Sequence, residues 1–226
     1  AINLTTKYFP YISLFVRVIF LVGFIAYKVL RIDTKLSILL VSGTAICGAT
    51  AMAAISPLIK AKPKDLLTAL GVIFIFNAIA IAMLPIIANH IEMSSEQFGS
   101  WVALAVHDTS SVIGAAMSFN DNAVETAATL KLGRTLWLIP LIIILGVFYK
   151  DNTSTKSIFP IFVLTFILAI FAGNQLNFNE QVLSILKNIS SIFLVGALFC
   201  IGMQINIMSI KVINSRIIIF ALLLWV

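Results

Sequence analysis

Charged residues are scarce in this 226-residue chain. Asp, Glu, Lys and Arg make up 11% of it and hydrophobic residues 61%, whereas a soluble domain carries roughly 25% charged residues. This scarcity excludes an ordinary soluble domain and indicates an integral membrane protein. The apolar segments are long enough for helices, so we expect about seven α-helical membrane segments rather than the alternating strands of a barrel.

Residues that bind metals or carry out nucleophilic catalysis are also few. The chain has two cysteines and two histidines. Cys47 and Cys200 lie in apolar surroundings, and no cluster has the spacing of metal ligands or of a disulfide framework. The sequence also lacks a phosphate-binding Walker loop, a dinucleotide-binding glycine motif and a nucleophile–base pair. We therefore expect no enzyme, no cofactor and no metal.

Basic residues outnumber acidic ones, with a formal net charge of +6. They stand in short loops between apolar segments, which is typical of the positive-inside bias rather than of nucleic-acid binding. The expected surroundings are a lipid bilayer, and the expected location is the bacterial plasma (inner) membrane with several passes. Basic loops flank residues 36–59 on both sides, so this segment is either re-entrant or leaves one basic loop outside.

We expect residues 1–226 to form a single transmembrane domain, with a core-like part at 36–149 and scaffold helices elsewhere. The chain starts at Ala1 rather than at methionine and stops inside an apolar run at Val226. We therefore expect a fragment of a longer protein. A homodimer is a candidate assembly.

One polar stretch contains, in succession, His107, Asp108, Thr109, Ser110 and Ser111. An ionised carboxylate at membrane depth must pair, protonate or meet water. His107 and Asp108 are therefore candidate proton-coupling residues, with a helix cap as the alternative for Asp108 or Thr109. The three hydroxyl residues favour local backbone bonds over regular helix, and would start a half-helix whose free amides attract an anion.

A second stretch consists of Thr44, Ala45, Ile46, Cys47 and Gly48. It echoes the first, because a threonine precedes small residues and a glycine. Two such stretches predict two interrupted helices whose breaks lie close together and face one substrate site, an arrangement found in many transporters. We interpret Cys47 itself as a small packing residue rather than a reactive thiol.

Asn77, Lys131 and Arg134 are candidate supporting residues. Asn77 stands alone in an apolar segment, where an interhelical hydrogen bond and a ligand contact are the alternatives. Lys131 and Arg134 are three residues apart and share a helical face. They would either attract an anionic substrate at the cytoplasmic mouth or anchor the helix at the lipid headgroups.

The helix that follows the first polar stretch carries small residues at every fourth position, Ser110, Gly114 and Ser118. These positions share one face, and small side chains allow the backbones of two helices to approach closely. We therefore expect this face to pack tightly against a neighbouring helix.

The chain resembles a known family in SGTAICGA (42–49), AAISPLIKA (53–61), QFGSWVALAVHDTSSVIGAA (97–116) and LKLGRTLWLIP (130–140). These segments are similar to the bacterial family of predicted sulfate exporters, over about residues 36–140 and more weakly to the end. The resemblance implies the sodium/proton antiporter and bile-acid symporter type of fold. That fold has inverted repeats, two discontinuous helices that cross near mid-membrane, and a core that moves against a scaffold. The family is longer, so an early and a late span are expected to be absent here.

The predicted fold class is therefore all-α, a polytopic transmembrane helical bundle with two discontinuous helices and inverted repeats. The predicted function is secondary transport or export of a small anion of the sulfate, sulfonate or carboxylate class, with proton coupling as an option. The anion would bind between the two broken helices. The alternatives are a cation/proton antiporter that binds its ion at Asp108 and a non-transporting membrane scaffold or sensor.

Overall fold

The computed structural model describes residues 2–149 and 214–225, together with isolated positions and residues 181–186 between them. Its contacts group residues 1–149 with 207–226 in one unit and residues 150–206 in a second. Within the second unit, residues 181–186 are helical. Of the roughly seven membrane segments expected from the sequence, two correspond to the apolar runs 158–172 and 182–203, and these lie largely outside the described residues.

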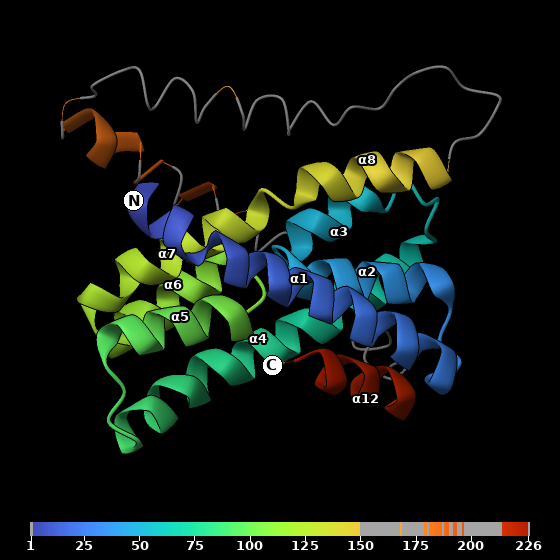
Figure 1. The fold of residues 1–226 in the computed structure, drawn as a ribbon, viewed down its shortest axis with the longest axis horizontal. Helices are drawn as coiled ribbons and strands as arrows, with labels where there is room; N and C mark the ends of the chain where they lie inside the picture. Colours follow the sequence, from blue (N-terminus) through green and yellow to red (C-terminus); the bar gives the residue numbers. More distant parts are fainter. Residues whose placement is uncertain are drawn as a thin grey trace. The chain divides into compact units, whose positions relative to one another are not determined.

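The first unit is built of helices (Figure 1), and the residues described in it include no strand. The helices are α1 (Ile2–Leu30), α2 (Thr34–Ala45), α3 (Ala49–Ile55), α4 (Pro63–His90), α5 (Ser95–Ala105), α6 (Thr109–Phe119), α7 (Asp121–Thr135), α8 (Leu138–Phe148) and α12 (Ser215–Leu224). Three stretches are long and apolar enough to cross a membrane, namely Tyr8–Leu30, Pro63–His90 and Asp121–Phe148. The all-α fold class is confirmed.

The first interrupted segment is a hairpin of α2 and α3. Asp33 caps the start of α2, since its Oδ1 accepts a hydrogen bond from the Lys35 amide at 2.9 Å. At the same end, Lys35 Nζ donates to the carbonyl oxygen of Lys60 at 2.7 Å. The chain therefore leaves this segment where it entered, and the basic loops before and after it lie together. This hairpin geometry fits the re-entrant alternative, and we call α2–α3 hairpin 1.

The second interrupted segment, α5–α6, is also a hairpin. Ser94 and Gln97 form a capping box at the start of α5. Phe98 in the first turn of α5 stacks on Phe119 at the end of α6, with ring centroids 4.3 Å apart. The two helices therefore run in opposite directions, and the chain returns to the end from which it came. We call α5–α6 hairpin 2.

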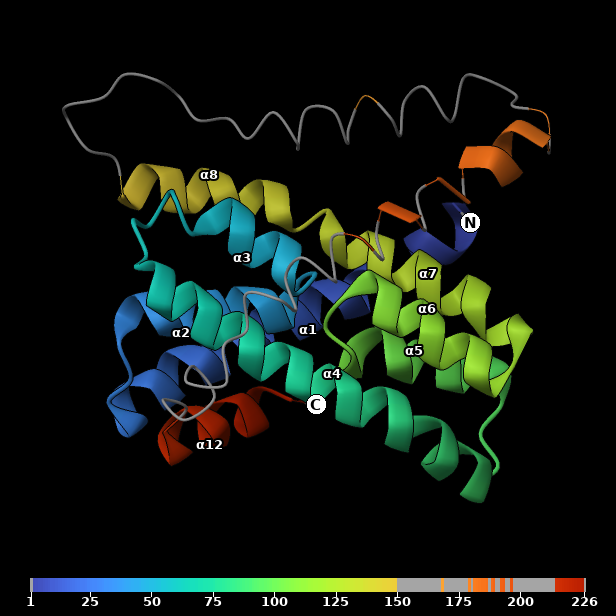
Figure 2. The same ribbon diagram turned by 180° about the vertical axis from the view of Figure 1, so that it is seen from behind.

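The two hairpins lie at opposite ends of α4 (Figures 1 and 2). The open end of hairpin 1 adjoins the start of α4, because this hairpin precedes the helix, and the open end of hairpin 2 adjoins its C-terminal end, because this hairpin follows it. At about 1.5 Å per residue, α4 is roughly 42 Å long and can cross a bilayer. Tyr8, early in α1, bonds to Glu96 at the open end of hairpin 2, so α1 and α4 run in opposite directions. A long helix followed by a hairpin thus occurs twice with inverted orientation, in agreement with the predicted inverted repeat.

This arrangement corrects one expectation taken from the family resemblance. The interrupted segments do not pass each other as two crossing spans. Each enters from its own end of α4, and their tips meet midway along it (Figure 2). The backbone breaks are therefore the turns of two hairpins rather than gaps within two continuous spans.

The packing of α6 contradicts a second expectation. A Cβ added at Gly114 would meet no atom within 4 Å, and both Gly114 and Ser118 are exposed among the described residues. The small-residue face is therefore not a helix contact in this part of the chain. The buried face of α6 consists of Val112, Ala115 and Ala116. It belongs to an apolar cluster that joins α4, α5, α6 and α7.

Candidate functional site

The tips of the two hairpins touch at Gly48. Its φ of +64° lies in the left-handed region, and an added Cβ would stand 3.3 Å from both the Asp108 amide nitrogen and the His107 carbonyl carbon. A side chain is rarely tolerated at such a φ, so glycine allows both the turn and the contact. The prediction that the two breaks lie close together is confirmed.

The breaks are shorter than predicted. The first comprises residues 46–48, since Thr44 and Ala45 form the last turn of α2. The second comprises residues 106–108, since residues 109–111 form the first turn of α6. Thr44 cannot cap the following half-helix, because the N-cap residue of α3 is Gly48, which has no side chain.

The Arg134 side chain binds carbonyl groups at the C-terminal ends of α2 and α5, which are the first helices of the two hairpins. Helix ends leave their last carbonyl groups without an intrahelical partner. Arg134 of α7 donates to the carbonyl oxygens of Thr44 and Ala45 at the end of α2, the latter at 3.2 Å. Through Nη1 it donates to Ala103 at 2.5 Å and Leu104 at 3.0 Å, at the end of α5. Arg134 thus ties the tip of hairpin 1 to the tip of hairpin 2.

Two further donors complete the end of α5. Lys131 Nζ donates to the Val106 carbonyl at 2.7 Å, and Trp225 Nε1 to the Ala105 carbonyl at 2.8 Å. The Trp225 indole is held by an edge-to-face contact with Phe76, with centroids 4.9 Å apart. Residues 103–106 therefore all have partners for their carbonyl oxygens. Sequence reasoning missed Trp225, because no local pattern connects it to a turn 120 residues earlier.

The positions of Lys131 and Arg134 correct both interpretations made from the sequence. Each side chain is 0% exposed, so neither lies at a mouth or at the headgroups among the described residues. Cations are favourable at helix C-terminal ends, where the macrodipole is negative. Arg134 is also 4.8 Å from the ring centroid of Phe15 in α1. We conclude that both cations are structural parts of the hairpin junction.

Asn77, midway along α4, holds the tip of hairpin 2. Its Oδ1 accepts a hydrogen bond from the His107 amide at 2.9 Å and lies 2.9 Å from His107 Nδ1. Its Nδ2 donates to Oδ1 of Asp108. Of the two roles predicted for Asn77, the structure therefore shows the hydrogen bond to another segment. Since Asn77 Oδ1 is an acceptor, His107 in this network carries its hydrogen on Nδ1.

Asp108 is the N-cap residue of α6. Its Oδ2 accepts hydrogen bonds from Ser110 Oγ at 2.7 Å and from the Ser111 amide at 2.9 Å, while Oδ1 is bound by Asn77. The geometry of Asp108 is therefore that of a helix cap, which was the alternative predicted for it. Whether His107 or Asp108 also couples transport to protons stays a prediction.

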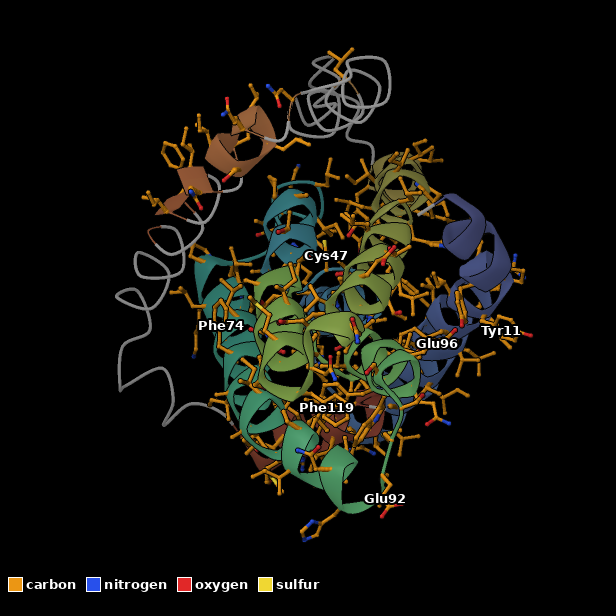
Figure 3. All side chains as sticks on the ribbon, turned by 90° about the vertical axis from the view of Figure 1, so that its left-hand side faces the viewer. Tyr11, Cys47, Phe74, Glu92, Glu96 and Phe119 are labelled. Atoms are coloured by element: carbon orange, nitrogen blue, oxygen red, sulfur yellow. The ribbon has the colours of Figure 1, made fainter. Side chains whose placement is uncertain are left out.

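The start of α6 has donors that remain available. The amides of Thr109 and Ser110 donate to no acceptor within the part of the chain that the structure describes, and both residues are half-buried. Cys47 lies inside the bundle, as its label in Figure 3 shows, and is 4% exposed. Ile46 is buried as well. The described residues hold no group of three or more His, Cys, Asp or Glu suited to a metal ion.

Comparison with known proteins places the chain among bacterial membrane proteins. The family model described as conserved hypothetical protein 698 matches residues 3–221. The chain is 36% identical over 210 residues to a UPF0324 membrane protein of Vibrio vulnificus, covering 91% of this chain and 68% of that one. It is 39% identical over 214 residues to one from Photobacterium profundum, with 95% and 65% covered.

A UPF0324 membrane protein of Bacteroides thetaiotaomicron is 40% identical over 204 residues, with 90% of this chain and 62% of the relative covered. The chain therefore spans about two thirds of the length of these relatives. No solved structure matches it. The chain belongs to the conserved hypothetical protein 698 family of membrane proteins.

Proposed function

We propose that this chain is the hairpin-bearing part of a secondary transporter that moves a small anion of the sulfate, sulfonate or carboxylate class. Transport is proposed to be proton-coupled and to take place across the bacterial inner membrane, in a multi-pass protein. The substrate would bind where the tips of the two hairpins meet. The observation that carries this proposal is the excess of buried positive charge at that junction.

The charges of the junction can be counted from the described residues. Lys131 and Arg134 contribute two positive charges and Asp108 one negative charge, all on buried side chains. The macrodipole adds about half a negative charge at each C-terminal end, of α2 and α5, and about half a positive charge at each N-terminal end, of α3 and α6. These partial charges cancel. With Lys131 and Arg134 both protonated, one positive charge remains at the junction. Such a charge is costly in a low-dielectric interior, so an anion is the ligand that lowers this cost.

The start of α6 supplies suitable hydrogen-bond donors. The free amides of Thr109 and Ser110 lie beside the Thr109 hydroxyl, whereas the Ser110 hydroxyl already donates to Asp108. Amide and hydroxyl donors bind oxyanions well. The carbonyl ends of α2 and α5, which would repel an anion, are already bound by the cations and by Trp225. Residues 44–48 would contribute mainly backbone atoms and shape, because their side chains are buried.

The geometry also weighs against the cation alternative. A cation site would need lone pairs on Asp108, but Asn77, Ser110 and the Ser111 amide already bind its two oxygens. For the scaffold or sensor alternative, uptake by the purified protein is the discriminating measurement. We propose no catalytic role, since no nucleophile–base pair accompanies the junction.

Uptake by the full-length protein in proteoliposomes tests the proposal. Labelled sulfate, methanesulfonate, acetate and sodium ions would be compared. Asp108→Asn removes the negative charge, so anion uptake should persist, whereas a cation transporter should lose activity. In this variant, however, the new amide would face the amide of Asn77. The double variant Asn77→Asp/Asp108→Asn restores a donor–acceptor pair and should fold like the parent, and Glu92→Gln in an exposed loop is the charge-matched control.

Anion uptake that survives in the double variant supports the proposal. Sodium uptake that disappears in Asp108→Asn, without any anion uptake, would establish the cation antiporter instead. If well-folded protein takes up none of the four ions, the transporter proposal is wrong for these substrate classes, and the scaffold alternative takes its place.

A further inference from the structure

A groove runs between α1 and α2 on the outside of the bundle, away from the hairpin tips. Its volume is about 250 Å³, below the roughly 300–1,000 Å³ of a typical small-molecule pocket. It is lined by Phe20, Gly23, Phe24, Tyr27, Thr34, Ser37, Ile38 and Val41. Gly23 forms its floor, where an added Cβ would stand 2.3 Å from Cγ2 of Val41. The groove therefore suits a thin, flexible chain better than a compact ligand.

The two ends of the groove differ in chemistry. Phe20 and Val41 line the end farther from the α1–α2 loop, while Tyr27 and Thr34 line the loop end. Lys28 Nζ lies 4.4 Å from the ring centroid of Phe24, a wall of the groove. An ammonium group is thus held directly beside an apolar channel.

The loop adds a second cation at a fixed place. Arg31 closes α1 with a φ of 53°, and the next amide, that of Ile32, donates to the Tyr27 carbonyl at 3.1 Å. This left-handed closure is typical of helix C-terminal ends and fixes the backbone of the loop. The Arg31 and Lys28 side chains are both exposed. Asp33 caps α2, and Lys35 is bound to the Lys60 carbonyl.

We propose that this groove binds one anionic phospholipid, with an acyl chain between α1 and α2 and the phosphate at Lys28 and Arg31. The two halves of the groove match the two halves of that molecule, apolar along the helices and cationic at the loop. Basic residues next to a membrane segment attract anionic headgroups. Long cationic side chains can also keep an apolar stem in the membrane while the head reaches the interface. This inference does not depend on the transport proposal.

The test measures lipid binding to the full-length protein in detergent, by native mass spectrometry and by the thermal unfolding midpoint. Dioleoyl phosphatidylglycerol is compared with dioleoyl phosphatidylcholine, and inorganic phosphate and glycerol 3-phosphate serve as headgroup probes without chains. The variant is Lys28→Gln/Arg31→Gln. The matched control is Lys62→Gln/Lys64→Gln, which removes two exposed lysines from the neighbouring basic loop. Ile38→Trp is designed to fill the groove without changing any charge.

Each basic residue near anionic lipid contributes about fivefold in affinity. The Lys28/Arg31 variant should therefore lose roughly 30-fold in its preference for phosphatidylglycerol, whereas the control should retain it. Ile38→Trp should weaken binding of both lipids, because both need the groove for a chain. Equal losses in the variant and the control would show a diffuse charge effect and overturn the proposal. Stabilisation by the headgroup probes equal to that by phosphatidylglycerol, or unchanged binding in Ile38→Trp, would show that the groove holds no chain and would overturn it as well.

Discussion

Arg134 donates from Nε to the carbonyl oxygen of Ala45 at 3.2 Å, at the tip of hairpin 1. The other nitrogens of the same guanidinium bind Thr44 in hairpin 1 and Ala103 and Leu104 in hairpin 2. A planar guanidinium has five donors spread over three nitrogens and can reach four acceptors at once, whereas an ammonium group has three donors on one nitrogen. The junction of the two hairpins therefore depends on arginine at this position.

Arg134→Lys should destabilise the protein although it keeps the positive charge. A lysine has three donors and would leave at least one of the four carbonyl groups without a partner, at a cost of about 1–3 kcal/mol for each buried group. The unfolding midpoint in detergent should fall, and trypsin should cut the protein faster. Arg17→Lys is the control, because the Arg17 side chain is exposed and should tolerate the change. Equal midpoints for Arg134→Lys and the parent would show that the guanidinium does not hold the junction.

Gly48→Ala should destabilise the contact between the hairpin tips. The φ of +64° costs a non-glycine residue about 1–2 kcal/mol, and the new Cβ would press on the backbone of Asp108 at 3.3 Å. Gly114→Ala provides the opposite case, because its Cβ meets no atom within 4 Å inside a helix. Alanine there should be neutral or stabilising by up to about 1 kcal/mol. Thermal unfolding of the two variants side by side is the measurement, and the reverse order would contradict the geometry.

The sequence predicted the helical class, the two interruptions and their proximity. These features follow from local signals, since long apolar runs contrast sharply with successive hydroxyls and glycines. Sequence alone left the path of residues 36–59 open, because basic loops on both sides fit two topologies. The bond from Lys35 to the Lys60 carbonyl fits the re-entrant path, and no periodic pattern could have predicted it.

The roles of Lys131, Arg134 and Trp225 could not be predicted, for a related reason. Each binds carbonyl groups from turns 25 to 120 residues away in the sequence. Backbone carbonyls are chemically the same at every residue, so a sequence does not show which ones lack partners. Only the packed structure shows that these side chains bind helix ends inside the bundle rather than lying at the headgroups.

Trp225→Phe should lower stability by about 1 kcal/mol. It removes the donor to the Ala105 carbonyl at 2.8 Å and keeps a ring against Phe76. Trp137→Phe is a matched control, because Nε1 of Trp137 is buried without an acceptor among the described residues. That change should be neutral or slightly stabilising, since it removes a buried unpaired donor. If both variants lose the same stability, the loss comes from the smaller ring and not from the indole hydrogen bond of Trp225.

Single cysteines should report the hairpin topology in whole cells. In a background with Cys47→Ala and Cys200→Ala, Arg31→Cys and Lys62→Cys should both be labelled only after the membrane is permeabilised. Both lie in the basic loops, which the positive-inside bias places in the cytoplasm. Glu92→Cys, at the other end of α4, should react with an impermeant maleimide in intact cells. Opposite accessibility of residues 31 and 62 would mean that hairpin 1 crosses the membrane.

The net positive charge at the junction also predicts the pH dependence of transport. A monovalent anion neutralises this charge alone, but sulfate carries two negative charges and needs one proton for the same balance. Sulfate uptake should therefore rise as the pH falls, whereas methanesulfonate uptake should change little. Proteoliposomes with a set internal and external pH, and initial rates of both substrates, provide the comparison.

His107 is the candidate coupling residue that the next variant tests. Oδ2 of Asp108 accepts the two hydrogen bonds that cap α6, and its Oδ1 accepts one from Asn77. His107 holds its Nδ1 hydrogen towards Asn77 at 2.9 Å, which leaves Nε2 as the nitrogen that gains a proton. His107→Gln should flatten the pH profile for sulfate, while His90→Gln, at the exposed end of α4, should keep it. A wild-type profile in both variants would exclude His107 as the coupling group and leave it as a structural partner of Asn77.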